Sequence, residues 1–149
     1  MKRQIFILLL LISASAYGQS FSCSPEHVTL ASHTSSGPYV EPTTTNWKRI
    51  DYHILGEKAV SMTYKHPDDP LTKINPLQRE EHVVLEASPE KVILLAATAA
   101  AAFSFTVDVI FPKDGNGYTF NVSDYPKFIP NHNLNNLSKL YVLKCRELQ

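Results

Sequence analysis

Apolar and polar side chains alternate with a period of two along much of the chain from residue 47 onward. Because successive side chains of a β-strand point to opposite faces of the sheet, this alternation predicts half-buried strands. Leu55-Gly56-Glu57 can reverse the chain, so residues 47–65 are predicted to form a β-hairpin. The apolar positions of this hairpin are Ile50, Tyr52, Ile54, Val60, Met62 and Tyr64.

The same alternation recurs later in the chain. It predicts a strand near 81–87, a phenylalanine-rich and valine-rich strand over 103–111 and a strand over 118–122. The turn residues of 114–117 join the last two of these strands and tolerate positive φ, so a second hairpin is predicted there. A closing strand is predicted over 139–145.

The segment before the phenylalanine-rich strand is ambiguous. Residues 92–102 contain six alanines, and alanine is the strongest helix former and is depleted in strands. Ser88-Pro89 can form either a helix N-terminus or a tight turn between strands. The composition favours a buried helix near 89–102, with a strand as the alternative. The predicted fold class is therefore α+β: a mainly antiparallel β-sheet of about six strands with one Ala-rich buried helix, or alternatively an all-β sandwich or barrel.

The first residues are typical of an export signal. Lys2 and Arg3 precede a short apolar run that is followed by small residues, and the run is too short to span a bilayer. The sequence predicts a signal peptide over 1–18, a Ser/Thr/Pro-rich lead-in over 19–46 and a single globular domain over 47–149. The expected location is secreted or periplasmic.

The chain has two cysteines, Cys23 and Cys145. Export would place them in an oxidising compartment, so a disulfide between them is predicted. In the chain-entropy model, a bond that closes a loop of more than 100 residues stabilises a fold by about 4 to 5 kcal/mol. The pairing also argues against a membrane span over 92–111, because such a span would separate the two thiols.

Charge excludes one class of partner. Two of the 14 basic side chains lie in the signal segment, so the remainder carries 12 basic against 14 acidic side chains, a formal charge of about −2. No basic cluster is present, so nucleic acid is not expected as a partner. No stable membrane span is expected after signal cleavage.

Candidate binding residues are sparse. The six histidines are scattered, and none lies three or four residues from another, so no metal site is predicted. The densest group of possible ligands is His66, Asp68 and Asp69, in a proline-rich loop. Asp108 lies in mid-strand on the face opposite the phenylalanines, and His132 lies in a second loop. Solvated loops and a solvent-facing strand position are the simpler explanations of these residues.

The sequence contains no nucleophile elbow and no glycine-rich phosphate loop, and no cofactor is predicted. A non-catalytic binding or interaction module, with ligand contacts in the loops 66–80 and 124–138, is the favoured hypothesis. A structural subunit whose apolar 92–102 segment is covered on assembly is one alternative. A small hydrolase or metal-dependent enzyme is another, with candidate groups Asp108, His66 and His132.

Overall fold

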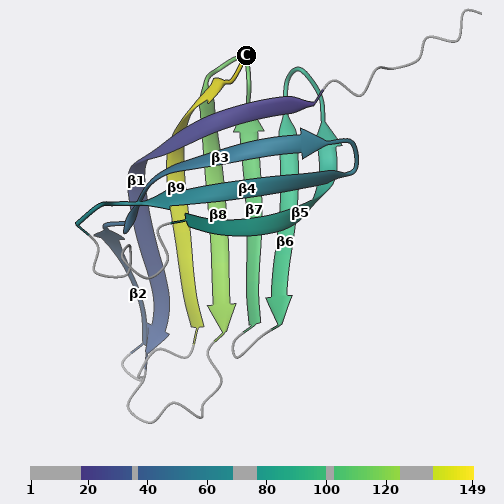
Figure 1. Cartoon of the computed structure of the whole chain (residues 1–149). Helices are drawn as coiled ribbons and strands as arrows, with labels where there is room; N and C mark the ends of the chain where they lie inside the picture. The colour runs from purple at the N-terminus through teal and green to yellow at the C-terminus, as the bar shows by residue number, and fades with distance from the viewer. Residues whose placement is uncertain (1–17, 35–36, 69–76, 100–102, 125–135) are drawn as a thin grey trace, which may run out of the picture.

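The computed structural model describes residues 18–34, 37–68, 77–99, 103–124 and 136–149. These residues form nine β-strands and no helix (Figure 1). The strands are β1 (Gln19–Thr34), β2 (Gly37–Thr43), β3 (Trp47–Leu55), β4 (Lys58–Lys65), β5 (Leu77–Ala87), β6 (Val92–Ala99), β7 (Phe103–Phe111), β8 (Asn116–Asp124) and β9 (Asn136–Glu147). The described residues contain no helix that is long and apolar enough to cross a membrane.

Eight of these strands form a closed antiparallel barrel. The order around the barrel is β1-β3-β4-β5-β6-β7-β8-β9, and β9 pairs again with β1. The remaining strand, β2, pairs with the later part of β1 and lies outside the closed ring. Every strand pairing among the described residues is antiparallel.

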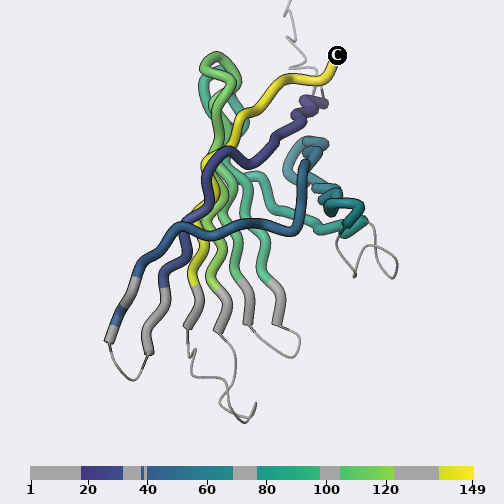
Figure 2. Tube along the Cα trace, turned by 90° about the vertical axis from the view of Figure 1, so that its left-hand side faces the viewer, coloured from purple at the N-terminus to yellow at the C-terminus, as the bar shows by residue number. Residues whose placement is uncertain are grey.

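Two strands turn the corners of the barrel. β1 pairs with β3 through Gln19–Cys23 and with β9 along most of its length. β5 pairs with β4 through Leu77–Val83 and with β6 only from Val83 to Ala87. The crossing strands, β3 to β5, therefore lie over one side of the layer that β6 to β9 and β1 form (Figures 1 and 2).

The core lies between the crossing strands and this layer. Tyr52 of β3 and Phe21 of β1 are no more than 1% exposed. Leu94, Ile110 and Leu143 of the opposite layer are equally buried, so apolar side chains from both sides fill the interior.

The predicted helix near 89–102 is wrong, and the fold is all-β. Residues 92–99 form β6, which pairs with β7 along its whole length and with β5 over its first half. Every second side chain faces inward: Val92, Leu94 and Ala96 are at most 3% exposed. Hydrogen bonding to two neighbouring strands outweighs the helix preference of alanine, which is a weak effect per residue. Residues 100–102 lie outside the described residues.

Both predicted hairpins are confirmed, but the predicted apolar positions Val60, Met62 and Tyr64 lie on the outer side of β4, whose buried residues are Ala59 and Ser61. β3 and β4 pair across the turn at Gly56, and β7 and β8 pair across the turn at Gly115. Both glycines have positive φ, at 69° and 65° respectively. This is a conformation that other residues adopt at a cost.

The range predicted as a lead-in contains β1 and β2, and β1 is part of the barrel wall. A β-bulge shifts the pairing with β9 between Pro25 and His27. The inward-facing Cys23 and Val28 are consequently an odd number of residues apart. The bulge therefore hides the two-residue period by which the other strands were predicted.

The predicted disulfide between Cys23 and Cys145 is confirmed. The two residues face each other in the register of β1 and β9, where the barrel closes. Gly117 of the adjacent β8 allows this close approach, because a Cβ at its position would lie 2.9 Å from Cys145 Sγ.

Candidate functional site

Five polar side chains from five different strands meet inside the barrel. None of them is more than 7% exposed, and all occupy the inward positions of their strands. We call them the polar cluster: Tyr52 (β3), Ser61 (β4), His82 (β5), Asp108 (β7) and Thr119 (β8).

Asp108 is at the centre of the polar cluster. Its Oδ1 accepts hydrogen bonds from the Tyr52 hydroxyl at 2.8 Å and from Thr119 Oγ1 at 2.5 Å. Its Oδ2 lies 3.5 Å from His82 Nδ1. On the far side of the imidazole, His82 Nε2 lies 2.8 Å from Ser61 Oγ. A continuous chain of polar contacts thus crosses the interior from β4 to β8.

Burial shifts the titration of both ionisable groups in opposite directions. It raises the pKa of Asp108 to about 6, although the hydrogen bonds from Thr119 and Tyr52 oppose the shift. It lowers the pKa of His82 to about 4. At neutral pH the carboxylate is therefore charged and the imidazole is neutral. Burial, followed by the charge of Asp108, raises the pKa of Tyr52, so its hydroxyl stays protonated and can donate.

The order Ser61, His82, Asp108 resembles the hydrogen-bonded order of a hydrolase triad. A triad also needs a serine that a substrate can reach. Ser61 is 0% exposed and the His82 side chain is fully covered. In this conformation, the polar cluster cross-links the interior of the barrel rather than lining an open active site.

The outer surface of β6 to β9 is apolar. The register of these strands arranges twelve of their outward side chains in three central rows across the sheet, and the row Phe111-Asn116-Lys144 borders them at the β7–β8 turn. We call these twelve positions the apolar face, and none of them is charged. The rows are Ile93-Val109-Tyr118-Val142, Leu95-Val107-Phe120-Leu140 and Ala97-Phe105-Val122-Ser138.

Large side chains of the apolar face are open to solvent. Tyr118 and Phe120 are each 42% exposed, and Leu140 is 40% exposed. Thr119 lies between Tyr118 and Phe120 on β8, and Asp108 lies between Val107 and Val109 on β7, but both face the interior. In the middle of β7 and β8, Asp108 and Thr119 are thus inside, and Phe105, Tyr118 and Phe120 are outside.

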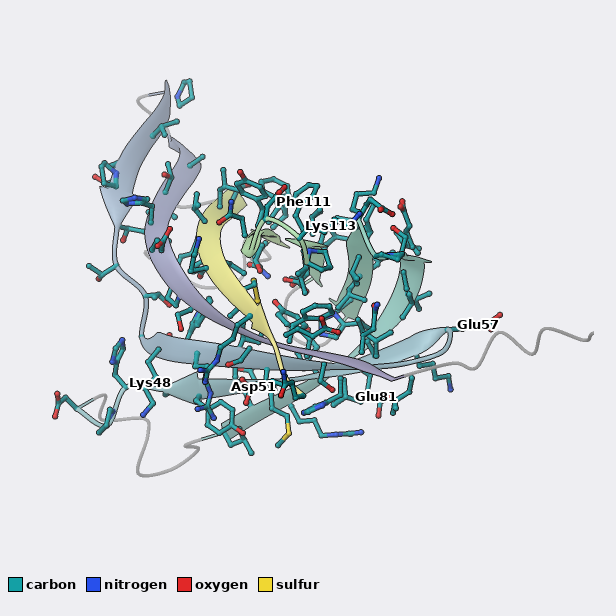
Figure 3. The ribbon with its side chains drawn as sticks, turned by 90° about the horizontal axis from the view of Figure 1, so that it is seen from above. Lys48, Asp51, Glu57, Glu81, Phe111 and Lys113 are labelled. Atoms are coloured by element: carbon teal, nitrogen blue, oxygen red, sulfur yellow. A yellow bond between two sulfur atoms is a disulfide. The ribbon has the colours of Figure 1, made fainter. Side chains whose placement is uncertain are left out.

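The outer surface of the crossing strands is mixed, with ion pairs beside exposed apolar side chains such as Leu55 and Val83. Arg49 forms an ion pair with Asp51 at 3.2 Å, and Arg79 forms one with Glu81 at 3.0 Å. Figure 3 shows Lys48, Asp51, Glu57 and Glu81 along these strands, whereas Phe111 and Lys113 lie on the other side, at the β7–β8 turn. The molecule therefore has two unlike sides.

Ion pairs border one end of the apolar face. Lys91 Nζ lies 3.0 Å from Glu86 Oε2, and Lys113 Nζ lies 2.6 Å from Glu90 Oε1. Since each lysine is paired with a glutamate, these residues give that border no excess of positive charge.

A cavity of about 560 Å³ lies where β5 leaves β6. One wall is formed by Leu95, Ala96 and Ala97 of β6. The opposite wall contains Arg79 and residues 81–83 of β5, among them His82, and Leu55 and residues 58–60 complete it. Leu95 and Ala97 of this lining belong to the apolar face, and His82 belongs to the polar cluster.

Among the described residues, the sequence candidates His66 and Asp68 lie apart from Asp108. His66 and Asp68 are exposed. His66 borders a separate cavity of about 510 Å³ with residues of β1 and 42–45, whereas Asp108 is 1% exposed inside the barrel. Asp69 and His132 lie outside the described residues. Within the ranges that the structure describes, no group of three or more His, Cys, Asp or Glu residues could hold a metal ion.

Sequence reasoning did not assign a site role to Tyr52, Ser61, His82 or Thr119. Each of them is a polar residue at one of the alternate strand positions that face the interior, as Tyr52 is between the buried Ile50 and Ile54. The sequence shows which residues share a side of a strand, but it does not show which side faces the interior, and only that knowledge identifies these residues as buried.

No protein-family model matches the chain, and no curated protein and no solved structure is significantly similar to it. Function must therefore be inferred from the geometry of this all-β, disulfide-bonded barrel.

Proposed function

We propose that the protein is an exported, non-catalytic interaction module that binds a partner protein through the apolar face. The observation that supports this function is the set of three uncharged rows on β6 to β9, with Tyr118, Phe120 and Leu140 open to solvent. Contiguous apolar patches on the surface of a folded protein are typical of interaction sites.

The size of the apolar face fits this role. Four strands about 4.8 Å apart, with three rows of side chains about 7 Å apart, cover an area on the order of 400 Å². Patches of about 300 to 600 Å² are the largest on typical monomers and are often functional. Burying such a patch against a complementary surface would favour association through the hydrophobic effect.

The surrounding charges favour a protein partner over an anionic lipid surface. Binding to anionic lipid gains much of its strength from unpaired basic side chains around an apolar surface. Here three lysines at one end of the face, Lys91, Lys113 and Lys144, are balanced by three acidic residues, Glu86, Glu90 and Asp114. The Cys23–Cys145 disulfide is consistent with export to an oxidising compartment.

The proposed binding surface differs from the one expected from the sequence. The loops 66–80 and 124–138 were the expected contacts, but most of their residues lie outside the described part of the chain. The apolar face is built instead on strands, whose side chains are held in a fixed register. A rigid surface of this kind loses little conformational entropy on binding.

Site-specific crosslinking in the producing cells tests this function. We would place p-benzoylphenylalanine at Phe120, in the middle row of the apolar face. The control position is Met62, which alternates with the buried Ser61 and lies on the outer surface of the crossing strands. Irradiation should give a discrete protein adduct from position 120 and none from position 62. Adding Leu140→Glu, directly beside Phe120 in the register, should abolish that adduct.

Equal crosslinking from both positions, or an adduct that survives Leu140→Glu, would contradict the proposal. The circular dichroism spectrum and melting temperature of the Leu140→Glu protein should match those of the wild type. This control is feasible because Leu140 is 40% exposed and its substitution does not open the core.

A further inference from the structure

We propose that the unpaired edge of β6, at residues 96–99, binds an extended segment of a partner polypeptide as an additional β-strand. The inference rests on the proposed function, since it names the kind of partner segment that an interaction module of this shape would take. Addition of a strand to a sheet edge is a recurring mode of peptide recognition.

The open edge follows from the path of β5. β5 pairs with β6 from Ala87 to Val83, and the last pair is Val83 with Leu95. From Val83 back to Leu77, β5 pairs with β4 and diverges from β6. Residues 96–99 therefore pair with β7 on one side, while no described strand pairs with them on the other. Alternate residues of a strand direct their N–H and C=O groups to each side, so this edge offers hydrogen-bonding groups to a ligand.

Space for a strand lies directly beside this edge. The cavity of about 560 Å³ is bounded by Leu95, Ala96 and Ala97 on one side and by Arg79 and residues 81–83 of β5 on the other. This volume is within the range of sites that bind small ligands or several side chains. Ala96 and Ala97 have short side chains, which leave room beside the strand for a ligand backbone.

The other free edges carry features that oppose strand addition. Edge strand β2 contains Pro38 and Pro42, each of which lacks a backbone donor. The diverging part of β5 carries Arg79, Glu80 and Glu81, and charged side chains are a common protection of sheet edges. The edge of β6 over 96–99 has the sequence Ala-Ala-Thr-Ala, which contains neither feature.

The surroundings of the cavity indicate the chemistry of the segment. Leu55 and Val83 line it and are 66% and 56% exposed, so they would gain by covering apolar side chains of a ligand. Lys58 adds a positive charge, whereas Arg79 is paired with Glu81. The expected ligand is an extended peptide with apolar side chains at alternate positions and without a net positive charge.

The test begins with a phage-displayed random nonapeptide library, selected on the immobilised disulfide-bonded protein. Calorimetry would then measure the affinity of one selected peptide for the wild type, Ala97→Lys and Val40→Lys. Ala97 is exposed on the open edge, and Val40 is 70% exposed on the proline-containing edge β2. Ala97→Lys should weaken binding about tenfold or more, and Val40→Lys should change it less than twofold.

Hydrogen exchange distinguishes strand addition from other modes of binding. Bound peptide should slow the exchange of amides in residues 96–99 and leave those in 37–43 unchanged. Failure to select any peptide that discriminates against Ala97→Lys would overturn the proposal. So would binding without protection at 96–99, or protection of 96–99 by self-association in the absence of peptide.

Leu140→Glu separates this inference from the proposed function. Leu140 lies on β9, three strands from β6 in the sheet, so the variant should retain peptide affinity within twofold. If position 120 crosslinks as expected but the peptide result fails, only the strand proposal is lost. If the peptide result holds and the crosslinks fail, only the role of the apolar face is lost.

Discussion

Asp108 combines a buried carboxylate with partners that are distant in the sequence. The Tyr52 hydroxyl, 56 residues away, and Thr119, 11 residues away, both donate to the same oxygen. Alternation along β7 places Asp108 opposite the phenylalanines, but it does not say which face is inside. Because charged residues are mostly exposed, the sequence favoured a solvent-facing position, and only the fold shows the interior partners.

The opposite pKa shifts of Asp108 and His82 predict a pH dependence that single variants uncover. The pKa of Asp108 rises from 3.8 to about 6 on folding. Its contribution to stability is therefore present below about pH 4 and is lost, by about 3 kcal/mol, as the pH rises through 6. The pKa of His82 falls from 6.5 to about 4, so its contribution is present above pH 6.5 and is lost as the pH falls through 4.

In the wild type these two contributions oppose each other between pH 4 and 6.5. Asp108→Asn leaves His82 unopposed, so its free energy of unfolding should fall by about 3 kcal/mol between pH 6.5 and 4. His82→Asn leaves Asp108 unopposed, so its free energy of unfolding should rise over the same interval. Urea unfolding at several pH values measures both slopes. If the free energy of unfolding of both variants changed with pH as it does in the wild type, the opposing contributions of Asp108 and His82 would be contradicted.

At the scale of elements, the alternating segments were predictable from sequence and the irregular ones were not. The β3–β4 and β7–β8 hairpins have a regular period and glycine turns, so their side-chain pattern and turn chemistry agree. β1 contains a bulge, and β2 contains two prolines, which removes the usual signals. β6 has a composition that favours a helix, and its pairing with β5 and β7 is a long-range effect that local propensity does not contain.

The strand assignment of β6 predicts unequal effects at two adjacent leucines. Leu94 is 0% exposed in the core, whereas Leu95 faces outward. Leu94→Ala should lower the free energy of unfolding by about 2 to 5 kcal/mol because it leaves a cavity. Leu95→Ala should lower it by about 1 kcal/mol or less. Urea unfolding of both variants measures the difference, and equal losses would be inconsistent with a strand in this orientation.

At the scale of the molecule, the barrel separates a side that carries ion pairs from an apolar face without charged side chains. The crossing strands carry ion pairs such as Arg49–Asp51, and β6 to β9 carry the apolar face. The polar cluster lies between them, inside the barrel. The alternation of apolar and polar residues in the sequence predicts strands on both sides of the barrel. The distribution of charge over the surface depends, in addition, on which strands become neighbours.

The disulfide stabilises this closed arrangement chiefly through the unfolded chain. Cys23 and Cys145 are 122 residues apart, so the bond restricts nearly the whole described chain when it unfolds. β1 and β9 also pair by backbone hydrogen bonds from Phe21 to His33. The double variant Cys23→Ala/Cys145→Ala should therefore retain the barrel but lose about 4 to 5 kcal/mol of unfolding free energy. Urea unfolding measures the loss, and circular dichroism checks the fold. Reductant should produce a similar loss in the wild type and no further change in the variant. A wild type that is equally stable with and without reductant would show that pairing between β1 and β9 alone holds the barrel closed.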